Sequence, residues 1–148
     1  FFEGDHLTHL KKLVAEKGLE ENFIFTGYRD DVRPWLKDFD VFAIPSNYPD
    51  PFPRSVIEGM SFALPVVAFE AAGGIVEAVD DGVTGILSGP GDTEEMGKAI
   101  AKLALDPVLR ESMGKAGRER VIAKFSAEAV AREVERNIFL ALGKDPGK

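Results

Sequence analysis

Residues 44–92 decide the fold of this chain. They read IPSNYPDPFPRSVIEGMSFALPVVAFEAAGGIVEAVDDGVTGILSGPGD. Two apolar runs of strand type, Val41–Ile44 and Pro65–Phe69, flank a segment in which Asp50 and Glu58 bracket the passage from a loop into a helix. In an open α/β sheet, such a junction is where a phosphate-bearing ligand binds.

Strand-type and helix-type patterns alternate on both sides of this junction. From the N-terminus they predict a strand end at Phe1–Phe2, a helix from Leu7 to Gly18, a strand at Phe23–Phe25, a short helix over Val32–Leu36, a strand at Val41–Ile44, a helix carrying Glu58, a strand at Pro65–Phe69, a helix over Ile75–Val79 and a strand at Gly85–Leu87. Near-continuous apolar strands are typical of parallel sheets that are buried on both faces. The sequence therefore predicts an α/β fold with a Rossmann-like, doubly wound parallel sheet.

After Asp92 the pattern changes to helices only. Asp92 with Glu95 resembles a capping box, Asp106-Pro107 predicts the start of a second helix, and Ser126 is typical of the cap of a third. We therefore expect a helical C-terminal part.

Length and composition indicate how many domains to expect and exclude several kinds of partner and site. The chain has 148 residues, which is the size of one domain, so we expect a single domain over residues 1–148. The net charge of −7, with no basic block, argues against nucleic acid as a partner, and no cysteine is present to form a disulfide or a thiolate metal site. The sequence has no apolar stretch long enough to span a membrane and no signal-peptide pattern, so a cytoplasmic location is the default. Neither a metal nor another cofactor is expected.

The loop before the helix predicts how a phosphate would be held. Prolines at positions 49, 51 and 53 keep the chain out of a helix until about Arg54, so the N–H groups of Arg54, Ser55 and Val56 should lack intrahelical acceptors. Arg54 is the one basic residue between positions 43 and 92, against seven acidic residues, so backbone N–H groups must supply most of the positive potential. Glu58 is flanked by apolar residues and should have a partner, for which a ribose diol is suitable.

A structural alternative stays open on spacing alone. Asp50 can cap a turn, and Glu58 can lie at the helix edge, bonded to a neighbouring backbone amide.

An ordered series of motifs resembles one family over nearly the whole chain. The series is Pro45-Ser46, Asp50-x7-Glu58, Gly59-Met60, Leu64-Pro65-Val66-Val67-Ala68, Gly73-Gly74-x-x-Glu77, Asp81-Gly82-x-x-Gly85 and Gly91-Asp92. It is similar to the C-terminal, donor-binding domain of GT-B glycosyltransferases, and more narrowly to the retaining group 1 family with the paired-glutamate E-x7-E motif.

The resemblance implies a role for each matching position. Asp50 and Glu58 would be the catalytic pair, with Asp50 contacting hydroxyls of the transferred sugar and Glu58 holding the ribose. The other implied donor contacts are diphosphate contacts by the loop of Phe52, Arg54 and Ser55, and nucleobase packing near Tyr28 and Arg29.

The sequence also departs from the family pattern. Position 50 is Asp rather than Glu, and Pro51 and Pro53 stand where glycines are common. Family members begin this domain with an earlier strand-helix unit whose Arg and Lys clamp the diphosphate, preceded by an acceptor-binding domain, and neither matches any part of this chain.

The resemblance thus implies a fragment of a larger two-domain enzyme. That enzyme would be a retaining hexosyltransferase that uses a nucleoside diphosphate sugar in polysaccharide or glycolipid synthesis, and the fragment is expected to be inactive alone. Its partner would be the missing N-terminal acceptor domain, and peripheral membrane contact of the full-length protein is compatible with this reading. The alternatives are a non-catalytic nucleotide-sugar-binding or interaction module of the same fold and, less favoured, a nucleotide-sugar epimerase.

Overall fold

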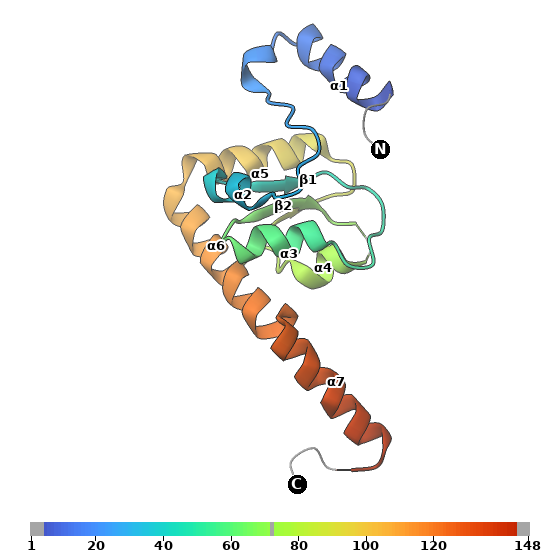
Figure 1. The fold of residues 1–148 in the computed structure, drawn as a ribbon. Coiled ribbons are helices and arrows are strands. Elements are labelled where there is room, and N and C mark those ends of the chain that lie inside the picture. Colours follow the sequence, from blue (N-terminus) through green and yellow to red (C-terminus); the bar gives the residue numbers. More distant parts are fainter. Residues whose placement is uncertain (1–4, 72, 145–148) are drawn as a thin grey trace. The chain divides into compact units, whose positions relative to one another are not determined.

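The computed structural model describes residues 5–71 and 73–144 (Figure 1). It divides into two compact units, residues 1–35 and residues 36–148, each of which is described by itself. The strand end expected at Phe1–Phe2 lies outside the described residues. The short helix predicted over Val32–Leu36 is confirmed as α2 (Arg33–Asp38). The boundary between the two units falls inside this helix.

The first unit is helix and irregular chain. It contains α1 (Asp5–Glu16), which ends before Gly18 at φ 65°, and the short 3₁₀-helix η1 (Glu20–Asn22). The predicted strand at Phe23–Phe25 is wrong, because these residues form no strand and Ile24 is 83% exposed. A strand needs a neighbouring strand to pair with its backbone groups, and the described part of this unit contains none.

The second unit is built on a parallel sheet. Its strands are β1 (Phe42–Ile44), β2 (Val66–Phe69) and β3 (Gly85–Ser88), in the order β1-β2-β3. The helix α3 (Arg54–Ser61) connects β1 to β2, and α4 (Gly74–Ala78) connects β2 to β3. The predicted parallel α/β fold is therefore confirmed.

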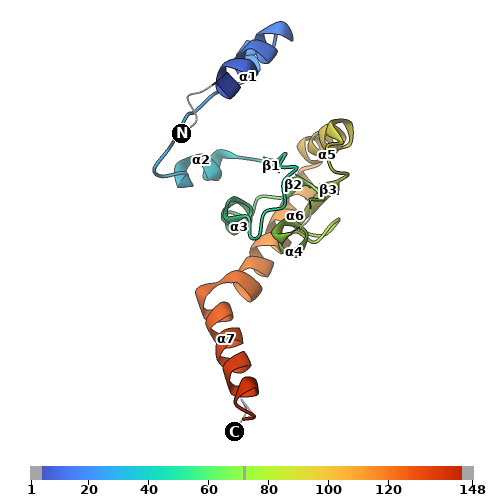
Figure 2. The ribbon, with the colours of Figure 1, turned by 90° about the vertical axis from the view of Figure 1, so that its right-hand side faces the viewer.

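Helices cover both faces of this sheet (Figures 1 and 2). Along β2, Val66 and Ala68 pack into the cluster that contains residues of α3 and α4, and Val67 and Phe69 pack into the cluster that contains residues of α5. All four side chains are almost fully buried. This alternation follows from the two-residue period of a strand and makes the sheet doubly wound.

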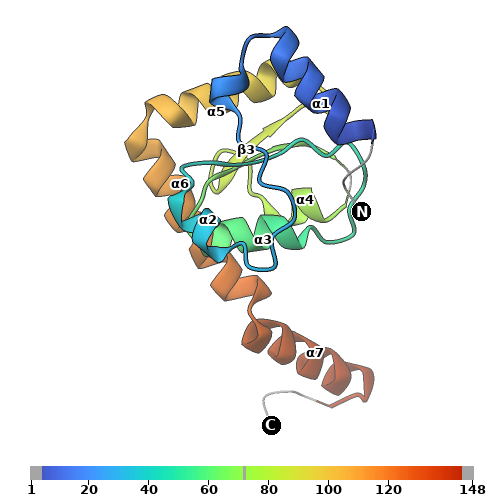
Figure 3. The same ribbon diagram turned by 45° about the horizontal axis from the view of Figure 1, so that its top comes forward.

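Three further helices complete the C-terminal part, as predicted. They are α5 (Thr93–Leu105), α6 (Pro107–Arg120) and α7 (Ala127–Ala141), and the π-helix η2 (Val121–Phe125) joins α6 to α7 (Figure 3). Asp92 and Ser126 cap α5 and α7 as predicted, because Asp92 accepts the N–H of Glu95 and Ser126 accepts the N–H of Ala129. At the predicted start of α6, Asp106 accepts the N–H of Leu109.

Half of the predicted capping box is wrong. The carboxylate of Glu95 accepts the N–H of Gly89 at 2.7 Å instead of the N–H of Asp92. The backbone N–H of Asp92 is already donated to the carbonyl of Gly89, so the reciprocal bond has no donor.

The helix α6 crosses the end of α3 with almost no space between them. Ala63 ends the turn after α3 in the left-handed region, at φ 60°, and a Cβ added at Gly114 would clash with the carbonyl group of Ala63. Gly117, one turn on, lies against Met60. Glycine is therefore required at position 114 for steric reasons.

The helix α7 contains no buried residue. Its apolar stripe of Val130, Val134 and Ile138 is 48%, 52% and 55% exposed, respectively. Among the described residues, no helix has both the length and the apolar character needed to cross a membrane.

Candidate functional site

The β1–α3 junction, residues 45–55, begins where β1 ends. Pro45 follows the last strand residue, Ile44, and α3 begins at Arg54, as the three prolines predicted. Pro53 is the N-cap and gives the helix no side-chain cap, because a pyrrolidine ring has no acceptor atom. The start of α3 is therefore open at the carboxyl edge of the sheet.

At this helix start, two N–H groups have no acceptor among the described residues. In the part of the chain that the structure describes, the N–H groups of Arg54 and Ser55 donate to no protein acceptor. The N–H of Val56 donates to the carbonyl of Pro53 at 3.0 Å, so the prediction that it lacks an acceptor is wrong. A 3₁₀-type bond tightens the first turn and uses this third donor.

The half-buried Asp50 shapes the loop before the helix. Its Oδ1 accepts the N–H of Phe52 at 2.9 Å, and its backbone carbonyl accepts the N–H of Gly74 at 2.6 Å. One carboxylate oxygen therefore caps a turn, as the structural alternative proposed, and the N–H of Phe52 is used inside the loop. The Oδ2 atom has no hydrogen-bond partner among the described residues.

The glycine pair Gly73-Gly74 brings a second helix start to the same place. Gly73 forms a parallel bridge with Asp50 and has φ 108°, a conformation that favours glycine. A Cβ at Gly74 would lie 2.6 Å from Cδ of Pro53 and 2.7 Å from Cα of Phe52. Both glycines are needed because the loop of residues 50–53 packs directly on the start of α4.

Glu58 lies one turn into α3 on its exposed side. Val56, Gly59 and Met60 face the core, so the intervening Glu58 points outward. The predicted apolar setting is therefore wrong, and no described residue bonds the carboxylate, including the neighbouring amide of the structural alternative. The carboxylate is free to accept hydroxyl groups from a ligand.

Arg54 is also exposed, and its guanidinium makes no ion pair with a described residue. Together, Asp50, Phe52, Arg54 and Ser55 are adjacent on one loop and the helix that follows it. The junction and Glu58 together present two open amides, one cation and two carboxylates, which suits a ligand with both phosphate and hydroxyl groups.

Tyr28 and Arg29 belong to the first unit. Tyr28 is 82% exposed, and the guanidinium carbon of Arg29 lies 5.5 Å from the centroid of the Trp35 ring. Nearby, hydrogen bonds from Arg33 to the carboxylate of Asp31 raise the pKa of Arg33. The part of Tyr28 and Arg29 in packing a nucleobase stays a prediction.

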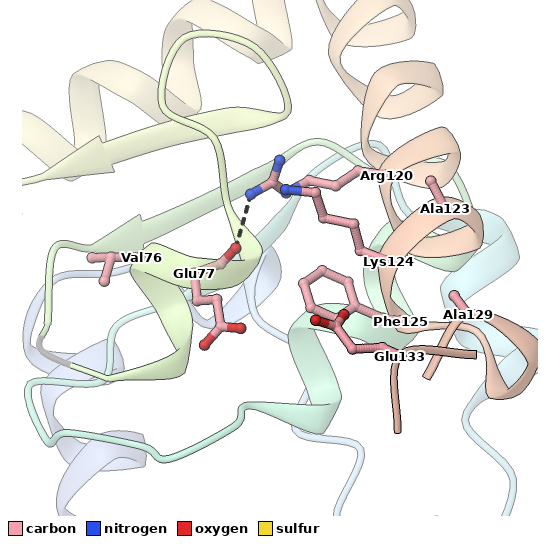
Figure 4. Close-up of a pocket in the computed structure, with 8 residues that line it drawn as sticks. All are labelled: Val76, Glu77, Arg120, Ala123, Lys124, Phe125, Ala129 and Glu133. Atoms are coloured by element: carbon pink, nitrogen blue, oxygen red, sulfur yellow. Dashed lines mark hydrogen bonds between the residues drawn. The ribbon is translucent and has the colours of Figure 1, made fainter. Parts of the chain in front are cut away.

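Two residues far along the chain contact this junction or the neighbouring α4, and no pattern in the sequence predicts either contact. The ring of Phe125 packs edge-on against Phe52, and Arg120 donates to the last carbonyls of α4. They line a cavity of about 440 Å³ between α4, η2 and α7 (Figure 4). No group of three metal-ligating side chains is found in the described ranges 5–71 and 73–144.

Known proteins are similar to this chain in sequence and in fold. The sequence is 30% identical to the lipopolysaccharide core biosynthesis glycosyltransferase LpsE of Rhizobium meliloti, over 86% of this chain and 37% of the relative. Anabaena HepE, solved in complex with UDP, has a TM-score of 0.86 and 28% identity, over 93% of this chain and 38% of that protein. The sucrose-phosphate synthase of Thermosynechococcus elongatus has a TM-score of 0.81 and 33% identity, over 93% and 35%.

This chain thus spans little more than a third of the length of these relatives. The GT-B fold expected from the motifs is confirmed by the solved structures, and the sequence pattern of the family described as glycosyl transferases group 1 matches residues 3–120. The chain therefore belongs to the glycosyl transferases group 1 family.

Proposed function

We propose that this chain is the donor-binding half of a retaining glycosyltransferase and that a nucleoside diphosphate sugar binds at the β1–α3 junction. The observation that carries the proposal is the pair of N–H groups at Arg54 and Ser55, which have no acceptor among the described residues and which lie between Asp50 and Glu58 in the sequence. Support also comes from the relative HepE, which was solved with UDP.

Each group has one proposed role. The N–H groups of Arg54 and Ser55 hold the diphosphate, with the positive end of the α3 dipole behind them. Asp50 accepts hydroxyls of the transferred sugar through its unbonded oxygen, and Glu58 accepts the two ribose hydroxyls. When the bond between the anomeric carbon and the diphosphate oxygen breaks, the same N–H groups stabilise the departing anion. The oxygen of the acceptor hydroxyl bonds to the face that the diphosphate left, and the hydroxyl proton passes to the departing diphosphate.

We infer that the complete enzyme is longer and has two domains. The proposed partner is an N-terminal domain that binds the acceptor, and an earlier segment supplies the basic clamp on the diphosphate. Acceptor positioning therefore depends on parts outside residues 1–148, so this chain should bind donor but transfer little sugar alone. A role in polysaccharide or glycolipid synthesis in the cytoplasm completes the proposal.

A titration followed by NMR tests donor binding. UDP and GDP are added to the ¹⁵N-labelled chain, and the amide signals of Arg54, Ser55 and Glu58 are expected to shift with saturation. Inorganic phosphate at the same concentration serves as the control for a non-specific anion effect. Absence of a response to both nucleotides at millimolar concentration, here and with the complete protein, would overturn the proposal.

A further inference from the structure

A side chain at the end of α6 contacts α4, and a side chain of the π-helix η2 contacts the β1–α3 junction. Arg120, at the end of α6, donates from Nε to the carbonyl of Ala78 and from Nη2 to the carbonyl of Glu77, both at 2.9 Å. Its Nη1 lies 3.7 Å from Oδ2 of Asp80, and its side chain is 20% exposed. One guanidinium therefore holds the last turn of α4 and Asp80 by three contacts, of which Figure 4 draws the bond to the carbonyl of Glu77.

Phe125, the last residue of η2, makes the second contact. Its ring lies edge-on to the ring of Phe52, with centroids 5.4 Å apart and an interplanar angle of 61°. Edge-on contact is one of the two preferred geometries of an aromatic pair. A π-helix is rare and widens the turn by one residue, which is why Phe125 and Arg120 can lie on one side of the same segment although five positions separate them.

Both contacts act on the loop of residues 50–53, directly in the case of Phe125 and through α4 in the case of Arg120. Phe52 lies in the loop of residues 50–53, and α4 begins at Gly74, whose N–H donates to the carbonyl of Asp50 at 2.6 Å. The fork of Arg120 thus fixes one end of α4, and the other end of α4 fixes Asp50.

This loop and α4 have few bonds of their own. Prolines at positions 49, 51 and 53 have no N–H, so the loop cannot hold itself by a regular hydrogen-bond pattern. The helix α4 has five residues, and a helix of this length is not stable without tertiary contacts. The place of both elements therefore depends on residues that pack on them.

We propose that Arg120 and Phe125 are positioning residues for donor binding, and that they act through α4 and Phe52 on the loop that carries Asp50. This inference rests on the proposed function. Neither residue touches the donor in this proposal. Loss of either contact lets the loop shift, and the N–H groups of Arg54 and Ser55 then no longer match the diphosphate.

The variants separate positioning from general stability. Phe125→Leu keeps an apolar side chain but removes the edge-on ring contact, and Phe125→Tyr restores the ring. Arg120→Lys keeps the charge but cannot bridge two carbonyls with a planar fork. The matched controls are Ile122→Ala, an exposed position in η2, and Arg132→Lys, whose guanidinium bonds a carbonyl of its own helix.

The measurements are the dissociation constant for UDP, and for GDP in parallel, together with the thermal midpoint and the ¹⁵N spectrum of the free chain. We expect Phe125→Leu and Arg120→Lys to bind about fivefold more weakly. For Phe125→Tyr and both controls, the dissociation constant should stay within about twofold of the wild-type value, a change no larger than one weak contact produces. In the free chain, both positioning variants should shift the amide signals of Asp50, Phe52 and Gly74.

The outcomes distinguish this inference from the proposed function. If the wild type binds no nucleotide, the proposed function fails and the inference with it, although the free spectra still test the contacts. If the wild type binds and the folded positioning variants bind equally well, or if the signals of Phe52 and Gly74 stay unchanged, the inference alone is overturned. Should Arg120→Lys fail to fold, the pair Phe125→Leu and Phe125→Tyr decides, because leucine keeps an apolar side chain and tyrosine keeps the ring.

Discussion

Three helices of the second unit begin at the carboxyl edge of the sheet, and their starts are built differently. The start of α5 is closed by Asp92, which accepts an N–H of the first turn at 2.8 Å. The starts of α3 and α4 follow Pro53 and Gly73, and neither has a side-chain cap. Away from this edge, α6 and α7 are capped by Asp106 and Ser126.

This difference separates the parts of the chain that only need to fold from the part proposed to bind. A cap stabilises a helix by about 1 kcal/mol, so an uncapped start gives up stability that a single Ser or Asp would supply. At α3 the two open N–H groups instead match the phosphate of the proposed donor. The substitutions below test whether capped helix starts contribute to stability alone and whether the uncapped starts contribute to donor binding.

The largest effect is expected at the uncapped start of α4. Gly74→Ala would place a Cβ 2.6 Å from Cδ of Pro53, so we expect the free energy of unfolding to fall by about 1 to 3 kcal/mol and UDP binding to be lost. The control is Gly97→Ala in α5, where a Cβ meets nothing within 4 Å. That change should instead stabilise by about 0.5 to 1 kcal/mol. Urea denaturation measures both, and equal effects would contradict the tight packing described here.

The next effect concerns binding rather than folding. Glu58 is exposed and has no protein partner among the described residues, so Glu58→Gln should leave the urea midpoint unchanged. UDP should bind about tenfold more weakly, because hydrogen bonds from the ribose to a charged acceptor are lost. Calorimetry gives the affinity, with Glu111→Gln on α6 as the charge-matched control. Unchanged affinity in Glu58→Gln would remove the ribose from the proposed site.

At a capped helix start, a substitution should lower stability and leave UDP binding unchanged. Asp106→Ala removes the acceptor for the N–H of Leu109 at the start of α6, so the free energy of unfolding should fall by about 1 kcal/mol. Asp106→Asn keeps an acceptor and should retain most of that stability. Both variants should bind UDP as the wild type does, and a clear loss of affinity would show that capped and uncapped starts are not separate in function.

The smallest effect is expected on α7. Val134 is 52% exposed on the apolar stripe of a helix that contains no buried residue. Val134→Gln should therefore change the free energy of unfolding of this chain by less than about 0.5 kcal/mol. A larger loss in a denaturation experiment would show that the stripe is covered when the chain is in solution.

Features that depend on neighbouring residues could be predicted from the sequence. The start of α3 at Arg54 follows from three prolines, and the caps Asp92, Asp106 and Ser126 each act within three residues. The strands of the second unit were also predicted, because their apolar runs are buried by helices that follow them directly in the chain.

Features that depend on residues far apart in the chain could not be predicted from the sequence. Phe23–Phe25 has the composition of a strand, but pairing is decided by a neighbouring strand that no local pattern reveals. Arg120 bonds residues more than forty positions away, and no spacing in the sequence predicts this contact. The sequence predicts an apolar environment for Glu58 that the structure does not have, because its apolar neighbours along the chain do not share its side of the helix.

The close crossing of α6 over the end of α3 has an evolutionary consequence. The Ala63 carbonyl occupies the space that any side chain at position 114 would need, so the two positions cannot vary independently. In an alignment of homologues, a residue larger than glycine at 114 should occur only together with a rebuilt turn around 63. The pair can therefore serve as a marker of which homologues keep this helix crossing.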